Sequence, residues 1–290
     1  MKLLRVGAPG AEIPAAIDAQ GTIRSLASLV PDLTPEWLAP ERLAALAAVD
    51  LTRLPALDPA TRIGVPVAGI RQFIGIALNY RKHAEESGQP IPAEPIVFTK
   101  AITSLSGPND DIVMPPGSEH TDWEIEMGIV IGTTARSVPR EKALDHVAGY
   151  CLANDVSERH WQNFRMGQWN KGKSFDSFGP IGPWLVTADE IPDPHALGME
   201  LRVNDEVMQA SSTSDMIFSV AELVSYVSQF MTLLPGDVIV SGTPGGVGMG
   251  LKPPRYLKQG DVLRLSMNGL GTQTQRVTMA GDVVPAEAGT

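Results

Sequence analysis

The sequence lacks most of the features that mark exported, membrane-bound or nucleic-acid-binding proteins. Its single cysteine, Cys151, cannot form an internal disulfide, which is typical of a reducing, cytoplasmic compartment. No apolar run approaches a membrane span, and the N-terminal one is too short for a signal peptide. Basic residues are outnumbered, 23 against 33 acidic ones, for a net charge of −10. We therefore expect neither nucleic acid nor an anionic membrane as a partner, although a few local cations can still hold a small anionic substrate.

The 290 residues are enough for one large domain or two unequal ones, and 43% hydrophobic residues with 19% charged ones are ordinary for a globular protein. We expect a small N-terminal domain over residues 1–68 and a larger one over 69–290. In the first, Gln20 and Gly21 separate two strand-like segments and predict a hairpin. Residues 41–48 are rich in alanine and leucine and predict a helix.

The larger part is a series of short strand-like segments separated by glycine and proline, with few long helices. Strand and helix do not alternate regularly, which disfavours a doubly wound sheet and favours a β-rich α+β fold. The clearest helix is predicted over 220–233 and a shorter one over 80–87. A hairpin is predicted around Asn204 and Asp205. Further strands are predicted at 73–78, 96–100, 238–240 and 262–265. The segment 145–155 is predicted to run from a helix end into a strand that ends at Asp155.

Residues 122–132 predict a buried strand, because β-branched residues are dense and polar and apolar residues alternate at its start. In a strand, Asp122, Glu124 and Glu126 project from one face, roughly 6–7 Å apart. Ionised carboxylates at that spacing repel one another unless they face water, share a proton or bind a cation. Oxygen ligands suit magnesium, manganese or calcium. A solvated strand face is the alternative, but the apolar run that follows favours entry into a core.

His83 and Glu86 stand three residues apart in the short predicted helix and share a face. A neutral imidazole beside a carboxylate can activate water. The alternative is a surface helix in which Lys82 pairs with Glu86.

Asp155 ends an apolar strand and precedes a predicted helix over 157–164. It can cap that helix, or it can supply a third carboxylate to a metal site. Arg159 and Gln162 follow on one helical face and can bind an anion or a carbonyl oxygen.

Lys173 lies between a glycine and a nearby aromatic residue, so it can direct a compact charge at a substrate oxyanion; an exposed turn is the alternative. The glycine-rich run 241–248 lacks the lysine of a phosphate-binding loop and is not followed by a helix. We interpret it as a tight loop whose backbone and Thr243 hydroxyl approach a ligand.

Taken in order, these residues resemble the fumarylacetoacetate hydrolase family over residues 73–277. The matching pieces are Asn79-Tyr80-x-x-His83-x-x-Glu86, Glu124-x-Glu126-x-Gly128, Asp155-x-x-x-Arg159-x-x-Gln162, Gly172-Lys173-Ser174-Phe175-Asp176 and Gly242-Thr243-Pro244-x-Gly246-Val247-Gly248. The N-terminal module and the residues after Lys173 resemble bacterial members that act on 2,4-diketo acids. Among these, the chain is most similar to hydrolases of 2,4-diketo-3-deoxy-L-rhamnonate or -fuconate.

The resemblance implies a β-rich roll of mixed sheets, commonly a homodimer. It also implies a role for each matching residue. Glu124, Glu126 and Asp155 would bind one divalent ion, Mg²⁺ or Mn²⁺ with Ca²⁺ as a further candidate, and Asp122 would stay outside the coordination shell. The catalytic residues would be His83 and Glu86, on a helix that orders over the substrate, and Lys173. The substrate-binding residues would be Arg159, Gln162, Thr243, Tyr80 and Gly242.

The activity implied is hydrolysis of the C3–C4 bond of a 2,4-diketo acid to pyruvate and a carboxylic acid. Water activated by His83 and Glu86 would attack C4, and the metal would stabilise the departing pyruvate enolate. Oxaloacetate decarboxylation and 2-hydroxymuconate-type isomerisation need the same stabilisation and are alternatives. A non-catalytic protein that binds 2-oxo acids is an alternative of another class.

Overall fold

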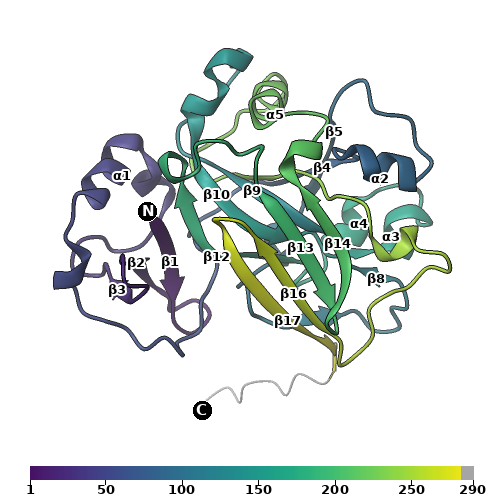
Figure 1. Cartoon of the computed structure of the whole chain (residues 1–290), viewed down its shortest axis with the longest axis horizontal. Helices are drawn as coiled ribbons and strands as arrows, with labels where there is room; N and C mark the ends of the chain where they lie inside the picture. The colour runs from purple at the N-terminus through teal and green to yellow at the C-terminus, as the bar shows by residue number, and fades with distance from the viewer. Residues whose placement is uncertain (282–290) are drawn as a thin grey trace.

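Two mixed sheets organise the chain, and the computed structural model describes residues 1–281 (Figure 1). The strands of the larger sheet are β1 (Lys2–Val6), β2 (Ile13–Ile17), β3 (Ile23–Ser25), β4 (Phe73–Ala77), β5 (Ile96–Lys100), β6 (Leu105–Ser106), β9 (Ile125–Ile131), β10 (Val147–Asn154), β12 (Gly179–Thr187) and β15 (Val238–Val240). Their order is β3-β2-β1-β12-β10-β9-β15-β4-β5, with β6 beside β12. The predicted β-rich α+β class is confirmed.

The smaller sheet has the order β14-β13-β16-β17-β7. Its strands are β7 (Ile112–Met114), β13 (Gly198–Val203), β14 (Glu206–Ser212), β16 (Val262–Met267) and β17 (Gly271–Met279), and a separate pair joins β8 (Thr121–Asp122) to β11 (Ser157–Glu158). The α-helices are α1 (Pro40–Ala47), α2 (Arg81–Glu86), α3 (Arg159–Asn163), α4 (Asn170–Lys173) and α5 (Val220–Val227). Short 3-10 helices occur at Pro35–Leu38, Leu51–Arg53, Ile102–Ser104, Arg140–His146, Ala188–Glu190, Thr213–Asp215 and Gly248–Gly250. No helix within residues 1–281 is long and apolar enough to cross a membrane.

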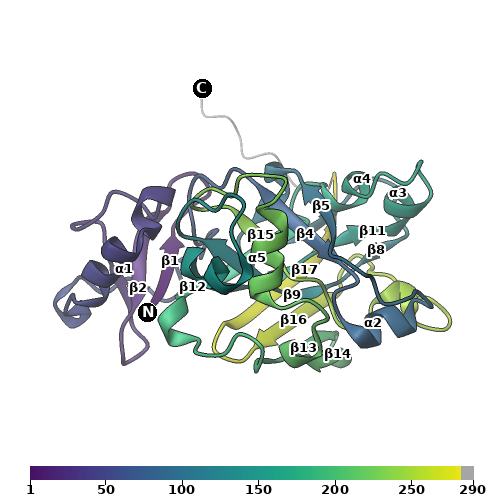
Figure 2. The same ribbon diagram turned by 90° about the horizontal axis from the view of Figure 1, so that it is seen from above.

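The N-terminal strands extend the larger sheet, because β1 pairs with β12 as well as with β2. The predicted hairpin is confirmed as β2 and β3, and the predicted helix over 41–48 as α1. Figures 1 and 2 show this N-terminal part at one end of the molecule and α2, α3 and α4 at the other. The domain boundary at residue 68 stays a prediction.

The main core lies between the two sheets. Ile125, Met127 and Ile129 of β9 belong to the same buried cluster as Leu201 of β13 and Leu265 of β16. Residues on the opposite face of β9 and its neighbours, among them Val130 and Cys151, pack against the N-terminal part. The strand is therefore buried on both faces, which explains why its sequence loses its polar alternation after Glu126.

Three predicted elements are shorter than expected. The strand predicted over 122–132 breaks at Trp123 and Glu124, because Asp122 pairs with Ser157 of β11 whereas β9 pairs with β10. The helix predicted over 220–233 ends at Val227, because Leu233 exchanges two backbone hydrogen bonds of 2.9 Å with Ala135. The helix predicted over 157–164 likewise begins as β11 and is helical from Arg159.

Candidate metal centre and active site

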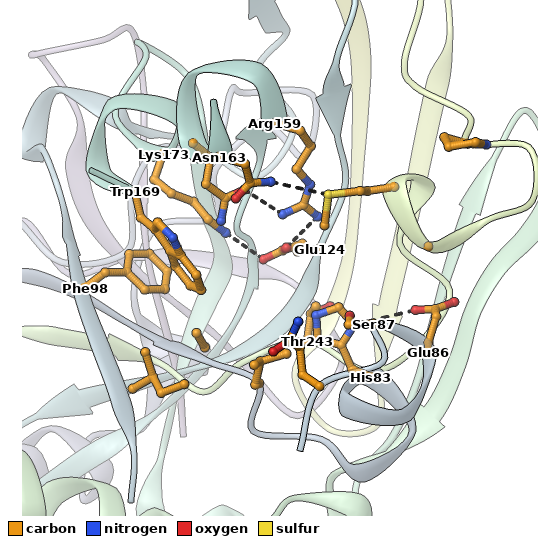
Figure 3. A pocket seen from close by; sticks show the side chains of 18 of the residues that line it. His83, Glu86, Ser87, Phe98, Glu124, Arg159, Asn163, Trp169, Lys173 and Thr243 are labelled. Atoms are coloured by element: carbon orange, nitrogen blue, oxygen red, sulfur yellow. Dashed lines mark hydrogen bonds and ion pairs between the residues drawn. The ribbon is translucent and has the colours of Figure 1, made fainter. Parts of the chain in front are cut away.

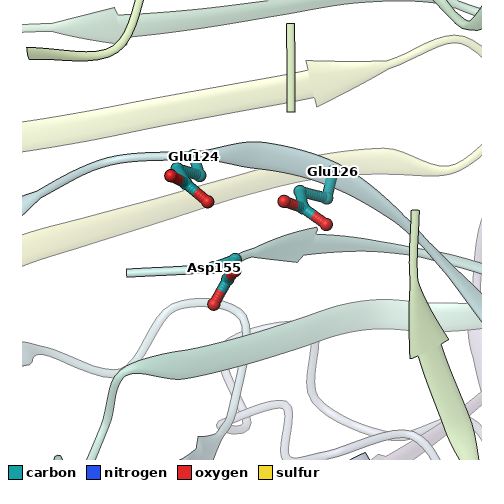
Figure 4. A group of neighbouring side chains, drawn as sticks. All are labelled: Glu124, Glu126 and Asp155. Atoms are coloured by element: carbon teal, nitrogen blue, oxygen red, sulfur yellow. The ribbon is translucent and has the colours of Figure 1, made fainter. Parts of the chain in front are cut away.

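Three buried carboxylates meet on one face of the larger sheet (Figure 4). Strands β9 and β10 are antiparallel with Glu126 opposite Ala153, so Glu124 lies opposite Asp155. The Asp155 N–H donates to the Glu124 carbonyl at 2.9 Å. Because opposed residues point to the same face, strand register brings the third carboxylate to the other two. One oxygen from each side chain lies within 4.8 Å of the others.

The alternatives weighed for these residues are wrong. Glu124, Glu126 and Asp155 are at most 5% exposed, so they do not form a solvated strand face. Asp155 does not cap α3, since the Glu158 carboxylate accepts from the Trp161 N–H at 2.7 Å instead. Asp122, which strand alternation put beside the glutamates, lies outside the group of three.

Three buried cations surround this group. The ammonium of Lys173 lies 2.5 Å from Asp155 Oδ2 and 2.8 Å from Glu124 Oε2. The ammonium of Lys100 lies 2.5 Å from Asp155 Oδ1. Arg159 Nη2 lies 2.7 Å from Glu124 Oε1. Glu126 has no such cation within residues 1–281, and it accepts the Gly242 N–H at 2.7 Å.

The two glutamates therefore titrate differently. Burial alone would raise the pKa of Glu124, but the charges of Lys173 and Arg159 outweigh burial and lower it. Burial raises the pKa of Glu126 well above its usual range, and the negative charges of Asp155 and Glu124 raise it further. Of the two glutamates, Glu126 is therefore the one that binds a proton more readily.

A cavity of about 780 Å³ opens over the carboxylates (Figure 3). Eight of the residues predicted from sequence line it: His83, Glu86, Glu124, Glu126, Arg159, Gln162, Lys173 and Thr243. Figure 3 shows Glu124 between Lys173 and Arg159, with Phe98 and Trp169 on one side and His83 on the other. Asp155 is 1% exposed, behind this surface.

His83 and Glu86 lie on α2 at the cavity wall. The distance from His83 Nδ1 to Glu86 Oε2 is 3.6 Å, longer than a hydrogen bond, and Nδ1 has no hydrogen-bond partner within the described residues. Both oxygens of Glu86 lie 3.0 Å from the Gly246 N–H. Burial opposes ionisation of Glu86, but His83 and the Gly246 N–H outweigh it and lower its pKa. Glu86 therefore faces the glycine-rich loop and His83, and no Lys82–Glu86 ion pair forms.

Lys173 and Arg159 are positioned by the close packing of α4 on α3. A Cβ at Gly172 would lie 2.4 Å from the Glu158 carbonyl oxygen and 2.6 Å from the backbone nitrogen of Gln162, so only glycine allows α4 to approach α3 this closely. Lys173 is 2% exposed, and the exposed-turn alternative is wrong. Arg159 Nη1 donates to Gln162 Oε1 at 3.0 Å, so the two residues form one polar unit at the cavity wall.

Three predicted substrate-binding residues have other contacts. Tyr80 is fully buried in the main core and does not line the cavity. Gly242 does not line it either, and its N–H holds Glu126. Thr243 does line it, but its hydroxyl donates to the Ile125 carbonyl at 2.9 Å and accepts from Gln209 at 2.8 Å. Thr243 therefore has no hydrogen left to donate to a ligand.

Sequence reasoning missed Lys100, Phe98 and Trp169. Lys100 ends the apolar segment of β5, and a charged residue there was the available signal for a buried ion pair. Phe98 lies over Gly75, where a Cβ would come within 2.1 Å of its ring, and it contacts Trp169 with ring centroids 6.0 Å apart. No local pattern links Phe98 to Trp169, which lies on the loop before α4.

The residues present fit a hard divalent ion. With a proton on Glu126, the three other buried carboxylates (Asp122, Glu124, Asp155) balance three buried cations (Lys100, Arg159, Lys173). A divalent cation that displaces this proton would leave one positive charge, and a monoanionic ligand would then balance it. Carboxylate oxygens are the donors that magnesium, manganese and calcium prefer.

Comparison with known proteins identifies similar chains. Residues 72–278 match the family described as fumarylacetoacetate (FAA) hydrolase, C-terminal. A protein of Burkholderia multivorans, named as a hydrolase by inference only, is 55% identical over 276 residues, which cover 95% of this chain and 98% of the relative.

Two solved structures are also similar. One is a 2-hydroxyhepta-2,4-diene-1,7-dioate isomerase from Mycobacterium marinum, 32% identical with a TM-score of 0.78, covering 97% of this chain and 99% of the other. The second is a maleylpyruvate hydrolase from Sphingobium sp. SYK-6 in complex with manganese(II) and pyruvate. It is 29% identical with a TM-score of 0.80, covering 96% of this chain and 99% of the other.

Proposed function

Because the chain belongs to the fumarylacetoacetate hydrolase family, we propose that it is a metal-dependent hydrolase of 2,4-diketo acids. It would cleave the C3–C4 bond and release pyruvate and a carboxylic acid. The observation that carries this proposal is the group of Glu124, Glu126 and Asp155 beside a cavity that His83 and Glu86 also line. The manganese and pyruvate in the similar maleylpyruvate hydrolase support the same ligand class.

Glu124, Glu126 and Asp155 would hold the ion, with Mg²⁺ or Mn²⁺ proposed and Ca²⁺ as a further candidate. When bound, the ion would supply Lewis-acid stabilisation of negative charge on the 2-oxo-acid part of the substrate. Arg159 and Gln162 would bind the carboxylate end of that part, because both line the cavity and Arg159 lies 2.7 Å from Glu124.

His83 would remove a proton from the attacking water. Glu86 keeps its charge because its pKa is lowered, so at 3.6 Å it can stabilise a proton on His83 Nδ1 and leave Nε2 free to take the proton from water. The water oxygen forms a bond to C4, and the C3–C4 electron pair leaves with C3, which gains a proton to become the methyl group of pyruvate. Lys173 would stabilise the negative charge on the C4 oxygen during attack.

The acyl tail would lie against cavity-lining residues other than the metal-site carboxylates. The lining of the cavity includes the apolar side chains Ile96, Phe98 and Trp169, with Ser87 and Gln89 as neutral polar groups. A 6-deoxy sugar acid has a terminal methyl group and few hydroxyls, which suits this mixture. We therefore propose 2,4-diketo-3-deoxy-L-rhamnonate or -fuconate as the substrate.

Isomerisation is the second candidate, because a similar structure is that of a hydroxyheptadienedioate isomerase. Decarboxylation of oxaloacetate would need the same stabilisation. The His83–Glu86 pair favours hydrolysis, since only hydrolysis consumes an activated water.

The test offers purified enzyme and Mg²⁺ the two sugar-derived diketo acids, acetylpyruvate, oxaloacetate and a 2-hydroxymuconate-type acid side by side. Formation of pyruvate and lactate from a sugar-derived acid, abolished by His83→Ala, supports the proposal. Carbon dioxide or an isomer as the only product would refute it. Binding of pyruvate and metal without any turnover would favour the non-catalytic alternative.

A cytoplasmic homodimer remains part of this proposal. Light scattering after size-exclusion chromatography would test the assembly, and a mass near that of one 31.0 kDa chain would contradict it.

A further inference from the structure

Asp122 is a buried carboxylate with no place in the group of three. It is fully buried, and its two oxygens accept four hydrogen bonds. Oδ1 accepts from the N–H groups of Trp123 at 2.8 Å and Gly248 at 2.7 Å. Oδ2 accepts from the Met249 N–H at 3.0 Å and from Arg159 Nε at 2.8 Å. With both oxygens in use, Asp122 has no position left for an ion.

These contacts join Arg159 to the loop 246–250, of which Met249 and Gly250 line the cavity. Arg159 is fixed at three nitrogens, by Asp122 at Nε, Gln162 at Nη1 and Glu124 at Nη2. If Glu124 coordinates an ion, its contact with Nη2 weakens. Asp122 and Gln162 would then keep the guanidinium in place, so that Nη2 can donate to a ligand.

The loop held by Asp122 also supports α2. Met249 and Gly250 line the cavity, and the Trp123 indole N–H donates to the Gly246 carbonyl at 3.0 Å. On its other side the same loop donates the Gly246 N–H to Glu86. Asp122 and Trp123 thus hold the loop whose Gly246 N–H donates to Glu86.

We propose that Asp122 is a positioning residue for the 2-oxo-acid ligand, acting through Arg159 and the loop 246–250. The inference rests on the proposed function, since it assigns Arg159 to the ligand's carboxylate. It assigns Asp122 to recognition of the organic ligand and not to the metal.

The experiment measures two affinities by calorimetry, for Mn²⁺ alone and for pyruvate with Mn²⁺ saturating. In Asp122→Asn, pyruvate binding is expected to weaken about 10- to 100-fold, as for loss of one or two charge-assisted hydrogen bonds. Mn²⁺ affinity should stay within about threefold, because Asp122 contacts none of the three metal-site carboxylates. Asp145→Asn, an exposed aspartate paired with Lys142, is the matched control and should change neither affinity.

A double-mutant cycle with Arg159→Lys separates positioning from general damage. If Asp122 acts through Arg159, the two substitutions together should weaken pyruvate binding little more than Arg159→Lys alone. Unchanged pyruvate affinity in Asp122→Asn, or an equal loss of Mn²⁺ affinity, would overturn the proposal. If Asp122→Asn does not fold, Asp122→Ser is measured in the same way.

Neither affinity depends on turnover. If the enzyme hydrolyses no substrate but Asp122→Asn weakens pyruvate binding and keeps its Mn²⁺ affinity, the proposed function is refuted and this inference stands.

Discussion

Metal binding should release a proton from Glu126. In the metal-free protein Glu126 is 1% exposed, accepts only the Gly242 N–H among the described residues 1–281, and has its pKa raised by burial and by Asp155 and Glu124. A divalent ion needs that carboxylate ionised, so binding must displace its proton. We expect about one proton released per ion, and an affinity that rises about tenfold per pH unit below the raised pKa.

Calorimetry of Mn²⁺ binding in two buffers of different ionisation enthalpy measures this number directly. Glu126→Gln should bind Mn²⁺ more weakly and release no proton, whereas Glu141→Gln, at an exposed position, should behave as the wild type. A wild-type protein that releases no proton would refute the reasoning, and so would proton release that persists in Glu126→Gln.

The same shift governs the stability of the metal-free protein. The folded pKa of Glu126 lies above its unfolded value, so its contribution is complete below the unfolded pKa of about 4.3 and is lost as pH rises through the folded pKa. Glu124 acts in the opposite direction, since its folded pKa is lowered and its contribution is lost only on acidification. The melting temperature of the metal-free protein should therefore fall as pH rises through the raised pKa, and the stabilisation by Mn²⁺ should grow.

Three further predictions concern turnover and packing. His83→Ala should lower kcat about 10²- to 10⁴-fold, as for loss of a general base, with Mn²⁺ affinity unchanged; near-normal turnover would exclude that role. Gly250→Ala should lower kcat because its Cβ would lie 2.5 Å from the Glu86 carboxyl carbon, whereas Gly245→Ala meets no atom closer than 3.5 Å and should have normal kinetics. Ile129→Ala in the fully buried β9 should reduce the free energy of unfolding by about 2–5 kcal/mol in denaturant titrations, and a loss below about 1 kcal/mol would contradict the packing described.

Much of the fold could be predicted because its signals are local. Local residue patterns were enough to predict the hairpin of β13 and β14. They were also enough for β5, and the predicted bounds of β5 are confirmed. The end of α5 was missed because the backbone pairing of Leu233 with Ala135 joins segments far apart in sequence.

The site divides in the same way. Strand parity put Glu124 and Glu126 on one face, but the approach of Asp155 depends on the register of β9 with β10, which no single segment encodes. The same alternation placed Asp122 on that face as well. This prediction was wrong, because the strand breaks after Asp122 and β9 begins only at Ile125. Lys100 escaped notice because its importance lies in its contact with Asp155, 55 positions away.

The most direct measurement is anomalous diffraction from crystals grown with Mn²⁺ and pyruvate. We predict one strong peak at coordination distance, about 2.0–2.6 Å, from an oxygen of each of Glu124, Glu126 and Asp155, with the pyruvate carboxylate and 2-oxo oxygens on the same ion. A peak elsewhere, or pyruvate bound away from the three carboxylates, would contradict the account.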